Sequence, residues 1–384
     1  MINHLFKLIW KKKRANFLMM LEFFISFMIL FAVWTICTYY FRNFKQPDGI
    51  TADRVWAVFT DFHSDTLRKE AKELINQRLI GFKEIESFSF SNSNIPFSFS
   101  NANRDFSYQK LKKSSEFMHF DPSIEKVLGL QLVAGRWYEE GDKTNKNKPI
   151  LINRNLSEAL FKSESPLGKL LEEDDSTRYR IIGVLENFKF KSDFEKPAAC
   201  VFIPTEDRTD VVIIKLREDV NRQFEVKLTK ELTSLGNNWE IEVQHMDEMK
   251  KNKNQLMLVP ILILFIISTF LIINVALGIF GVLFQVINQR KGEIGIRRAV
   301  GANQHGILIQ FIMETVVIAT LSIILGIFFA IQFPLLNVFD VETSTYILGI
   351  LLAVISIYLI VVVCAFLPSK QASKTYPALA LHEE

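Results

Sequence analysis

Residues 290–307 read RKGEIGIRRAVGANQHGI, a basic, glycine-punctuated stretch between two long apolar runs. Four of its first nine residues are Arg or Lys, and Glu293 is the one acid among them. Basic residues beside an apolar run indicate the cytoplasmic side of a membrane-spanning segment. The runs on either side of this stretch therefore decide the fold.

Four apolar runs are long enough to cross a bilayer, which takes about 20 residues. The predicted spans are residues 17–41, 256–287, 306–333 and 346–367. The first is too long for a cleavable signal peptide, and no small residues mark a cleavage point after it. The sequence predicts four transmembrane helices with a large extracytoplasmic domain inserted between the first and the second.

Lysine and arginine beside the runs set the orientation. Basic residues precede the first run, separate the second from the third and follow the fourth, whereas the short loop 334–345 has acids and no base. Both ends, residues 1–16 and 368–384, are therefore predicted to be cytoplasmic. Residues 42–255 and the short loop are predicted to be outside, and the basic segment 288–305 inside.

Composition and motifs exclude several classes of function. A net charge of +3 over 384 residues gives no reason to expect a nucleic-acid partner. The three cysteines leave only Cys200 in the inserted region, so no disulfide is expected there. The chain has no phosphate-binding P-loop, no nucleophile elbow, and six histidines without metal-ligand spacing. We expect no catalytic residue, metal or cofactor in this chain.

The inserted region has the patterning of a mixed α/β domain. Apolar positions at helical spacing predict a helix over residues 66–79. Strands at 149–152 and 179–185 are expected on either side of a short helix at 155–161, for which Asn153 is a suitable cap.

Phe and Ser alternate on both sides of a break in the stretch IESFSFSNSNIPFSFSN, residues 85–101. This pattern predicts a β-hairpin in which Phe88, Phe90, Phe97 and Phe99 share the buried faces. Two interpretations are open, an aromatic groove for an apolar substrate and an ordinary core, and the core is the commoner outcome.

Residues 237–258 are predicted to turn helical and to run into the second span without a turn. The apolar part alone, taken as one helix, is roughly 48 Å long at 1.5 Å per residue, against a hydrocarbon core of about 30 Å. The excess predicts a stalk helix that projects outward from the membrane. A tilted helix is the alternative.

The pattern between the second and third spans also predicts local order. Glu293 and Arg297 are neighbours in the favourable i, i+4 order on a short helix over residues 293–300. Gly301 suits the left-handed residue that ends this helix, and Asn303 suits the cap of the next one. A short helix held between two membrane helices can receive force from a partner.

These motifs resemble a known family. The residues QRKGEIGIRRAVGANQHGILIQFIMETVVIATLSIILGI resemble the signature of FtsX/MacB-type permeases of ATP-binding-cassette (ABC) systems. In the inserted region, LGLQLVAGRWY, ILINRNLSEALF, SPLGK and YRIIGVL are similar to the extracytoplasmic domain of the macrolide-exporter branch, and LPSKQASKTYPALAL resembles the family's closing pattern. The resemblance covers most of residues 125–205 and 270–380.

The resemblance implies that the segment after the second span is a coupling helix that docks on an ATPase. The residues that it assigns to ATPase coupling are Arg290, Glu293, Gly295, Arg297, Arg298, Gly301 and Ala302. Macrolide exporters carry a fused N-terminal ATPase, but here only residues 1–16 precede the first span. The ATPase, with its ATP and magnesium, is therefore expected in a separate chain.

The family also implies further partners and a function. Its members act as dimers, so a second permease subunit, identical or different, is expected in a bacterial cytoplasmic membrane. An efflux system adds a periplasmic adaptor and an outer-membrane channel. The implied activity is ATP-driven export or mechanotransmission, with antimicrobial, peptide, lipid or lipoprotein cargo. The alternatives are a regulatory subunit that senses or activates an outside partner such as a cell-wall hydrolase, and a membrane protein without any ATPase.

A few polar residues within the spans are candidates for function. Glu22 and Glu314 are acids at a costly depth. Glu314 matches a family pattern, Gln-Phe-x-x-Glu, which favours a structural or coupling role over proton relay, whereas Glu22 either has a function or reaches the interface. Asn274, Gly278 and Gly281 share a helix face, which favours close helix packing or dimerisation over substrate contact.

Overall fold

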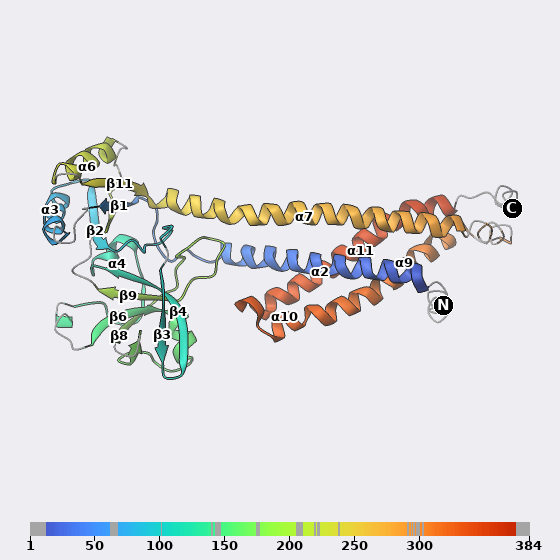
Figure 1. Ribbon diagram of the computed structural model, residues 1–384, viewed down its shortest axis with the longest axis horizontal. Helices are drawn as coiled ribbons and strands as arrows, with labels where there is room; N and C mark the ends of the chain where they lie inside the picture. Colours follow the sequence, from blue (N-terminus) through green and yellow to red (C-terminus); the bar gives the residue numbers. More distant parts are fainter. Residues whose placement is uncertain are drawn as a thin grey trace. The chain divides into compact units, whose positions relative to one another are not determined.

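The computed structural model divides the chain into two compact units (Figure 1). We call Asn43–Leu258 the inserted domain, and Met1–Arg42 with Val259–Glu384 the helical unit. The structure describes residues 13–61, 68–100, 102–139, 141–142, 147–173, 177–204, 210–218, 220, 223–236, 239–289, 292, 294, 296, 300–301 and 303–373.

Four helices of the described chain are long and apolar enough to cross a membrane. They are α2 (Lys13–Phe44), α7 (Met246–Gln289), α9 (Gln304–Ala330) and α11 (Thr343–Ser373), with the short α10 (Gln332–Leu335) and the 3-10 turn η3 (Val338–Asp340) between the last two. Each predicted span lies within one of these helices or, for the third, within α9 and α10 together.

The helical unit has a core made mainly by α2, α9 and α11. Phe23 and Phe27 of α2 are buried against α9 and α11, where Ala353, Ile357 and Val361 follow one another at four-residue spacing. Small and β-branched residues at that spacing form one narrow stripe, which lets helices approach closely without a large side chain between them. α7 contributes little to this core, chiefly Val275.

The inserted domain is built on one sheet of eleven strands. They are β1 (Val55–Asp61), β2 (Ile85–Ser91), β3 (Asn103–Tyr108), β4 (Leu111–Phe120), β5 (Leu132–Gly135), β6 (Lys148–Asn153), β7 (Leu170–Glu172), β8 (Arg178–Leu185), β9 (Cys200–Pro204), β10 (Val211–Leu216) and β11 (Glu240–His245). Its helices are α3 (Arg68–Ile80), α4 (Ile124–Leu128), α5 (Arg154–Phe161) and α6 (Gln223–Thr233).

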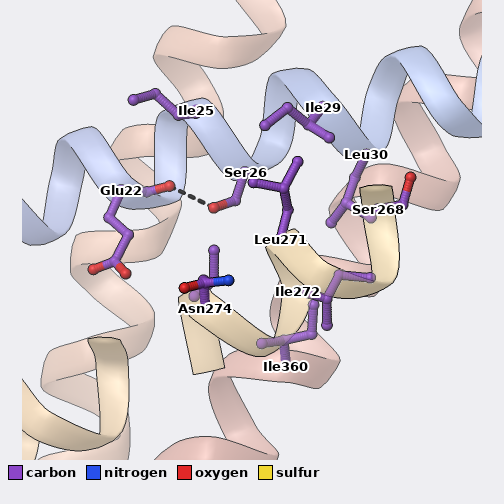
Figure 2. A pocket seen from close by; sticks show the side chains of 11 residues that line it. Glu22, Ile25, Ser26, Ile29, Leu30, Ser268, Leu271, Ile272, Asn274 and Ile360 are labelled. Atoms are coloured by element: carbon purple, nitrogen blue, oxygen red, sulfur yellow. Dashed lines mark hydrogen bonds between the residues drawn. The ribbon is translucent and has the colours of Figure 1, made fainter. Parts of the chain in front are cut away.

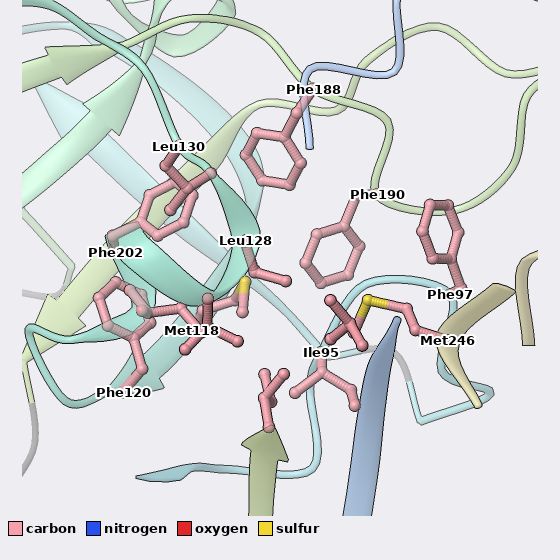
Figure 3. Packing of buried hydrophobic residues seen from close by; sticks show 14 of the residues in the cluster. Ile95, Phe97, Met118, Phe120, Leu128, Leu130, Phe188, Phe190, Phe202 and Met246 are labelled. Atoms are coloured by element: carbon pink, nitrogen blue, oxygen red, sulfur yellow. The ribbon is translucent and has the colours of Figure 1, made fainter. Parts of the chain in front are cut away.

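The sheet has an open part and a closed part. Strands run in the order β11-β1-β10-β2-β4-β3-β7-β8-β6-β9, and β9 pairs back onto β4, so that the strands from β4 to β9 form a closed ring. α3 and α6 cover the open part, where Ile75 and Leu228 are buried with Val58 and Val212. A second core beside α5 fills the ring, and a third, aromatic core joins the two parts (Figure 3).

The four apolar helices and the mixed α/β domain between the first two confirm the predicted fold class. Within the domain, the helix expected over 66–79 is α3, and the strand–helix–strand unit is β6, α5 and β8. Asn153 caps α5 as predicted, because its side-chain oxygen accepts a hydrogen bond from the Leu156 amide at 3.2 Å.

The predicted hairpin over residues 85–101 was wrong. Its first half is β2, which pairs with the apolar strand β10 rather than with its own sequence neighbour. Residues 92–100 form turns, and Asn94 holds them by donating to the carbonyl oxygens of Ala102 and Phe117. Alternation predicts a strand but not its partner, and the partner here is an apolar strand that is distant in the sequence.

The four phenylalanines of that stretch do not share a face. Phe90 and Phe97 are both buried, but in two different cores. Phe88 is half-buried beside Phe90, and Phe99 is 65 % exposed. Phe97 is positioned by a turn in which its φ is 64° and its amide donates to the carbonyl of Phe190.

The predicted helix over 237–258 was wrong in its first part. Residues 240–245 form strand β11, which pairs antiparallel with β1, and α7 begins only at Met246. The alternation of Ile241 and Val243 with glutamates has the period of a strand. From Met246 the helix continues through Pro260 to Gln289 without a break, as expected for the stalk and second span together.

Candidate functional site

Most of the candidate coupling residues lie outside the described part of the chain. These are Arg290, Glu293, Gly295, Arg297, Arg298 and Ala302. Their described neighbours Gly292, Ile294 and Ile296 are helical, and Ile294 is buried.

The predicted helix stop and restart is present at the described end of this segment. The Val300 amide donates to the Ile296 carbonyl at 3.0 Å, which closes a last helical turn. Gly301 then adopts φ 98°, in the left-handed region expected of a glycine that ends a helix. The side-chain oxygen of Asn303 accepts from the His305 amide at 3.3 Å and caps α9. The segment is therefore set off from α9 by a defined turn.

The helical unit contains a recess of about 200 Å³ between α2 and α7, with Ile360 of α11 in its wall (Figure 2). Its polar lining residues are Glu22, Ser26, Ser268 and Asn274. The two hydroxyls and the amide each donate to the backbone carbonyl four residues earlier on their own helix. Among the described lining residues, Glu22 thus carries the one charge, and the other polar groups are bonded within their own helices.

Gly278 is the position of α7 that accommodates Glu22. A Cβ atom added at Gly278 would meet the carboxylate of Glu22, whereas one added at Gly281 would meet no atom of the described residues within 4 Å. Asn274 is exposed. The three residues expected to form one packing face therefore differ within the single chain, and close packing is seen at Gly278. Dimerisation through Asn274 and Gly281 stays a prediction.

Glu314 lies half-buried on α9, where it accepts a hydrogen bond from Gln310 Nε2 at 3.1 Å. The partner is one turn earlier on the same helix, which is the i, i+4 arrangement that supports a helix locally. The Glu314 carboxylate therefore has a hydrogen-bond partner on its own helix. Its coupling role stays a prediction.

The motif LVAGRWY has structural contacts in the inserted domain. Arg136 donates through both terminal nitrogens to the two carboxylate oxygens of Asp142, at 2.6 and 2.7 Å. The next two side chains, Trp137 and Tyr138, donate to backbone carbonyls. The hydrogen bond from Arg136 holds the pKa of the Asp142 carboxyl below its ordinary value, although burial opposes the shift. The motif fixes a corner of the fold.

Sequence patterning gave no sign of a cluster of four charges in the inserted domain, formed by Asp48, Lys189, Asp193 and Lys250. Burial alone would raise the pKa of the Asp48 carboxyl, but hydrogen bonds and charges from Lys250 and Lys189 outweigh it and lower that pKa. Phe and Lys alternate in NFKFK, residues 187–191, but this local pattern does not indicate the partners at positions 48 and 250. Among the described residues, no group of His, Cys, Asp and Glu side chains could hold a metal ion.

Two family models match the chain. Residues 17–232 match the MacB-like periplasmic core domain, and residues 265–377 match the FtsX-like permease C-terminal domain. The first match alone covers more than half of the chain. The chain belongs to the FtsX/MacB family of ABC transporter permeases. It is a multi-pass membrane protein, and the family in general works with an ABC ATPase.

Curated relatives carry the name macrolide export ATP-binding/permease protein MacB. The chain is 27 % identical to the one from Campylobacter jejuni subsp. jejuni serotype O:23/36 (strain 81-176) over 280 residues, 67 % of this chain and 42 % of the relative. It is 29 % identical to the one from Aggregatibacter actinomycetemcomitans over 211 residues, 52 % of this chain and 32 % of the relative. The chain thus spans less than half the length of either relative.

Two solved structures are similar to the inserted domain. The periplasmic region of MacB from Actinobacillus actinomycetemcomitans aligns with a TM-score of 0.40 and 19 % identity, over 55 % of this chain and 97 % of that one. The extracellular domain of the ABC-type transporter YknZ from Gram-positive bacteria aligns with a TM-score of 0.36 and 15 % identity, over 49 % of this chain and 99 % of that one.

Proposed function

We propose that this chain is the permease subunit of an ABC export or mechanotransmission system in a bacterial cytoplasmic membrane, with both ends cytoplasmic. A separate ATPase subunit binds the segment 290–302, and its closure on ATP displaces that segment. The displacement passes along α7 to the inserted domain, which acts on cargo outside. Antimicrobial compounds, peptides, lipids and lipoproteins are the cargo classes that the relatives' branch suggests. A second permease subunit completes the membrane part.

The observation that carries this proposal is the order of the two family matches on one chain. The periplasmic core match ends before α7, the permease match begins within it, and the candidate coupling segment follows the last residue of that helix, Gln289. An unbroken helix of this length extends about 66 Å at 1.5 Å per residue. Its backbone hydrogen bonds make it stiff along its axis, which suits it to carry a displacement.

The stop at Gly301 and the cap at Asn303 support a docking role for the segment before them. Membrane anchoring requires only positive charge on the cytoplasmic side. It does not require a left-handed glycine and a new cap, which together make a defined turn before α9. A defined turn suits a segment that another protein must push.

The test is whether a cassette ATPase co-purifies with the full chain from its native host. The variant combines Glu293→Arg, Arg297→Glu and Arg298→Glu, and the control is Lys370→Glu, a charge reversal near another predicted cytoplasmic end. We expect wild type and control to retain the ATPase and the triple variant to lose it. Membrane insertion of each variant is checked first by protease accessibility.

Two outcomes would contradict the proposal. Equal retention by all three proteins would make the charges topology anchors and remove the docking role. Absence of the ATPase from the wild-type preparation would remove the partner itself. A deletion strain then distinguishes export, seen as altered drug susceptibility or retained cargo, from a regulatory role, seen as a cell-wall or chaining defect with normal efflux.

A further inference from the structure

Four charged side chains of the inserted domain form a closed ring in which positive and negative charges alternate. We call it the charge ring, and its members are Asp48, Lys189, Asp193 and Lys250. Lys189 Nζ lies 3.2 Å from Asp48 Oδ1 and 3.6 Å from Asp193 Oδ1. Lys250 Nζ pairs with Asp48 Oδ2 and lies 3.0 Å from Asp193 Oδ1. Each charge therefore has two neighbours of opposite sign, and the ring has no net charge.

Three of the four side chains are largely removed from water. The Lys189 side chain is 1 % exposed, and those of Asp193 and Lys250 are 11 % and 18 % exposed, whereas that of Asp48 is 42 % exposed. Buried ion pairs contribute little to stability on balance, because the loss of hydration cancels most of the attraction. Removing one partner is different, since it leaves a buried charge without compensation. Such a cluster is therefore better suited to fix a geometry than to stabilise a fold.

The ring joins three separate segments of the chain. Asp48 follows the end of α2, Lys189 and Asp193 belong to the loop 186–194, and Lys250 is in the second turn of α7. Lys189 also donates to the carbonyl of Phe44, the last residue of α2, at 3.4 Å. A cation at this position compensates the partial negative charge at a helix C-terminus.

Further hydrogen bonds repeat the same connections. The Lys189 amide donates to the Asp48 carbonyl at 2.8 Å. Asp193 and the Asn254 side chain form a reciprocal pair, in which Asn254 Nδ2 donates to Asp193 Oδ2 at 2.7 Å and Asn254 Oδ1 accepts from the Asp193 backbone amide at 2.9 Å. Asn43 in α2 donates to the Phe194 carbonyl at 3.0 Å. The loop is thus bonded to both helices by side chains and by backbone.

The loop 186–194 is in turn held by the core of the domain. Phe188 and Phe190 point into the aromatic core, where Phe97 and Met246 lie beside them (Figure 3). Lys189, between the two phenylalanines, points away from that core into the ring. In the stretch NFKFK the two phenylalanines therefore pack in the interior of the domain, and Lys189 between them contacts the end of α2 and pairs with the two acidic ring residues.

We propose that the charge ring is the joint that fixes the outer end of α2 and the first turns of α7 to one loop of the inserted domain. The inference rests on the proposed function for its role, in which a displacement of α7 reaches the domain through Lys250 and the loop 186–194. The ring is then a positioning device, and its four residues act together.

The first test measures the joint itself, without nucleotide. Hydrogen exchange of the full chain in detergent is compared for wild type, Lys250→Met and the matched control Lys251→Met, since Lys251 is exposed and has no ion pair within the described residues. Removing Lys250 leaves Asp48 and Asp193 short of positive charge, so we expect exchange in 43–48 and 186–194 to rise by on the order of tenfold. The control should stay within about twofold of wild type.

The second test separates geometry from stability. A fully neutral ring carries Asp48→Asn, Lys189→Met, Asp193→Asn and Lys250→Met, which leaves no buried charge unpaired and should keep the thermal unfolding temperature within a few degrees of wild type. With the ATPase bound, ATP should change exchange in the loop 186–194 of the wild type. In the neutral variant we expect ATP hydrolysis to continue while that change is lost.

The outcomes separate the two proposals. If Lys250→Met and Lys251→Met exchange alike, the ring is not a joint. If the neutral variant shows the same nucleotide-dependent change as the wild type, the ring is a joint that does not transmit. If the wild type binds no ATPase or shows no nucleotide-dependent change, the proposed function and the transmitting role fail together, while the first test still decides whether the joint exists.

Discussion

Helix α7 lies in two different surroundings within one unbroken run of hydrogen bonds. In its first turns, Met246 and Met249 are buried in the aromatic core of the inserted domain. Beyond Val259, Leu262, Phe265 and Phe270 are each at least 60 % exposed within the single chain. A domain folded in water gains free energy by hiding such side chains, whereas a membrane helix shows them to lipid or to another subunit at no cost. Apolar side chains are therefore buried within the chain in the first turns of α7 and exposed from it beyond Val259.

The largest expected difference in stability is between truncating a phenylalanine of the aromatic core and truncating one on the exposed part of α7. Phe202→Ala, in the aromatic core at 0 % exposure, should cost about 3–5 kcal/mol through lost burial and the cavity left behind. Phe265→Ala, at 66 % exposure, should cost less than about 1 kcal/mol. Urea unfolding of the full chain in detergent, followed by tryptophan fluorescence, measures both. Equal costs would mean that α7 packs within its own chain as tightly as the core does.

A charge placed at each of two exposed aliphatic residues sharpens the comparison. Val226 on α6 is 71 % exposed and Leu262 on α7 is 60 % exposed. We expect Leu262→Lys to oppose membrane insertion by about 2.5–3.5 kcal/mol and Val226→Lys to change stability by at most about 0.5 kcal/mol. Insertion yield and thermal unfolding of the purified proteins test the pair. An inert Leu262→Lys would place this part of α7 in water.

Glycine substitutions compare a closely packed position on α11 with an uncontacted position on α7, both in the helical unit. A Cβ added at Gly349 of α11 would meet backbone atoms of Thr35 at 3.1 Å, which cannot move aside independently of the helix, whereas Gly281 of α7 has open space around it. Gly349→Ala should therefore cost about 1–3 kcal/mol, and Gly281→Ala should be neutral or slightly stabilising. Thermal unfolding in detergent decides between them, and a destabilising Gly281→Ala would indicate a partner helix at that face.

The smallest of these effects is expected from acid, which should lower the stability of the inserted domain by protonating its paired carboxyls. The pKa of Asp142 is lowered in the fold from 3.8, so its contribution to stability is complete above about pH 4 and is lost as pH falls through the folded value. Asp142→Asn should flatten this acid limb in urea unfolding between pH 7 and pH 3. Asp53→Asn, at a side chain that is 84 % exposed, should leave it unchanged, and identical curves for the two variants would contradict the role of the Arg136 contact.

The sequence predicted what depends on local pattern. Apolar length determined the four helices, since a spanning segment must be long and uninterrupted. Asn153, Gly301 and Asn303 each act at the helix end beside them, so their roles could be inferred from the residues next to them. Local chemistry of this kind depends on neighbours a few residues away.

The rest depends on partners that are far apart in the chain. Strand β2 pairs with β10, which lies more than a hundred residues further along the chain. Strand β11 was predicted as helix, because the alternation that marks it is short and lies in the charged stretch 237–258. The charge ring joins residues 48, 189, 193 and 250. No local period connects such positions, because only the closed sheet and the start of α7 bring them together.

The first and last strands of the inserted domain, β1 and β11, pair antiparallel along their length, from Trp56 opposite His245 to Asp61 opposite Glu240. The chain therefore leaves the domain beside the place where it came in. Domains whose ends lie close together in this way are tolerated as insertions in a host chain. The inserted domain is a module in this sense, so we expect that the helices of one permease can be recombined with the inserted domain of another.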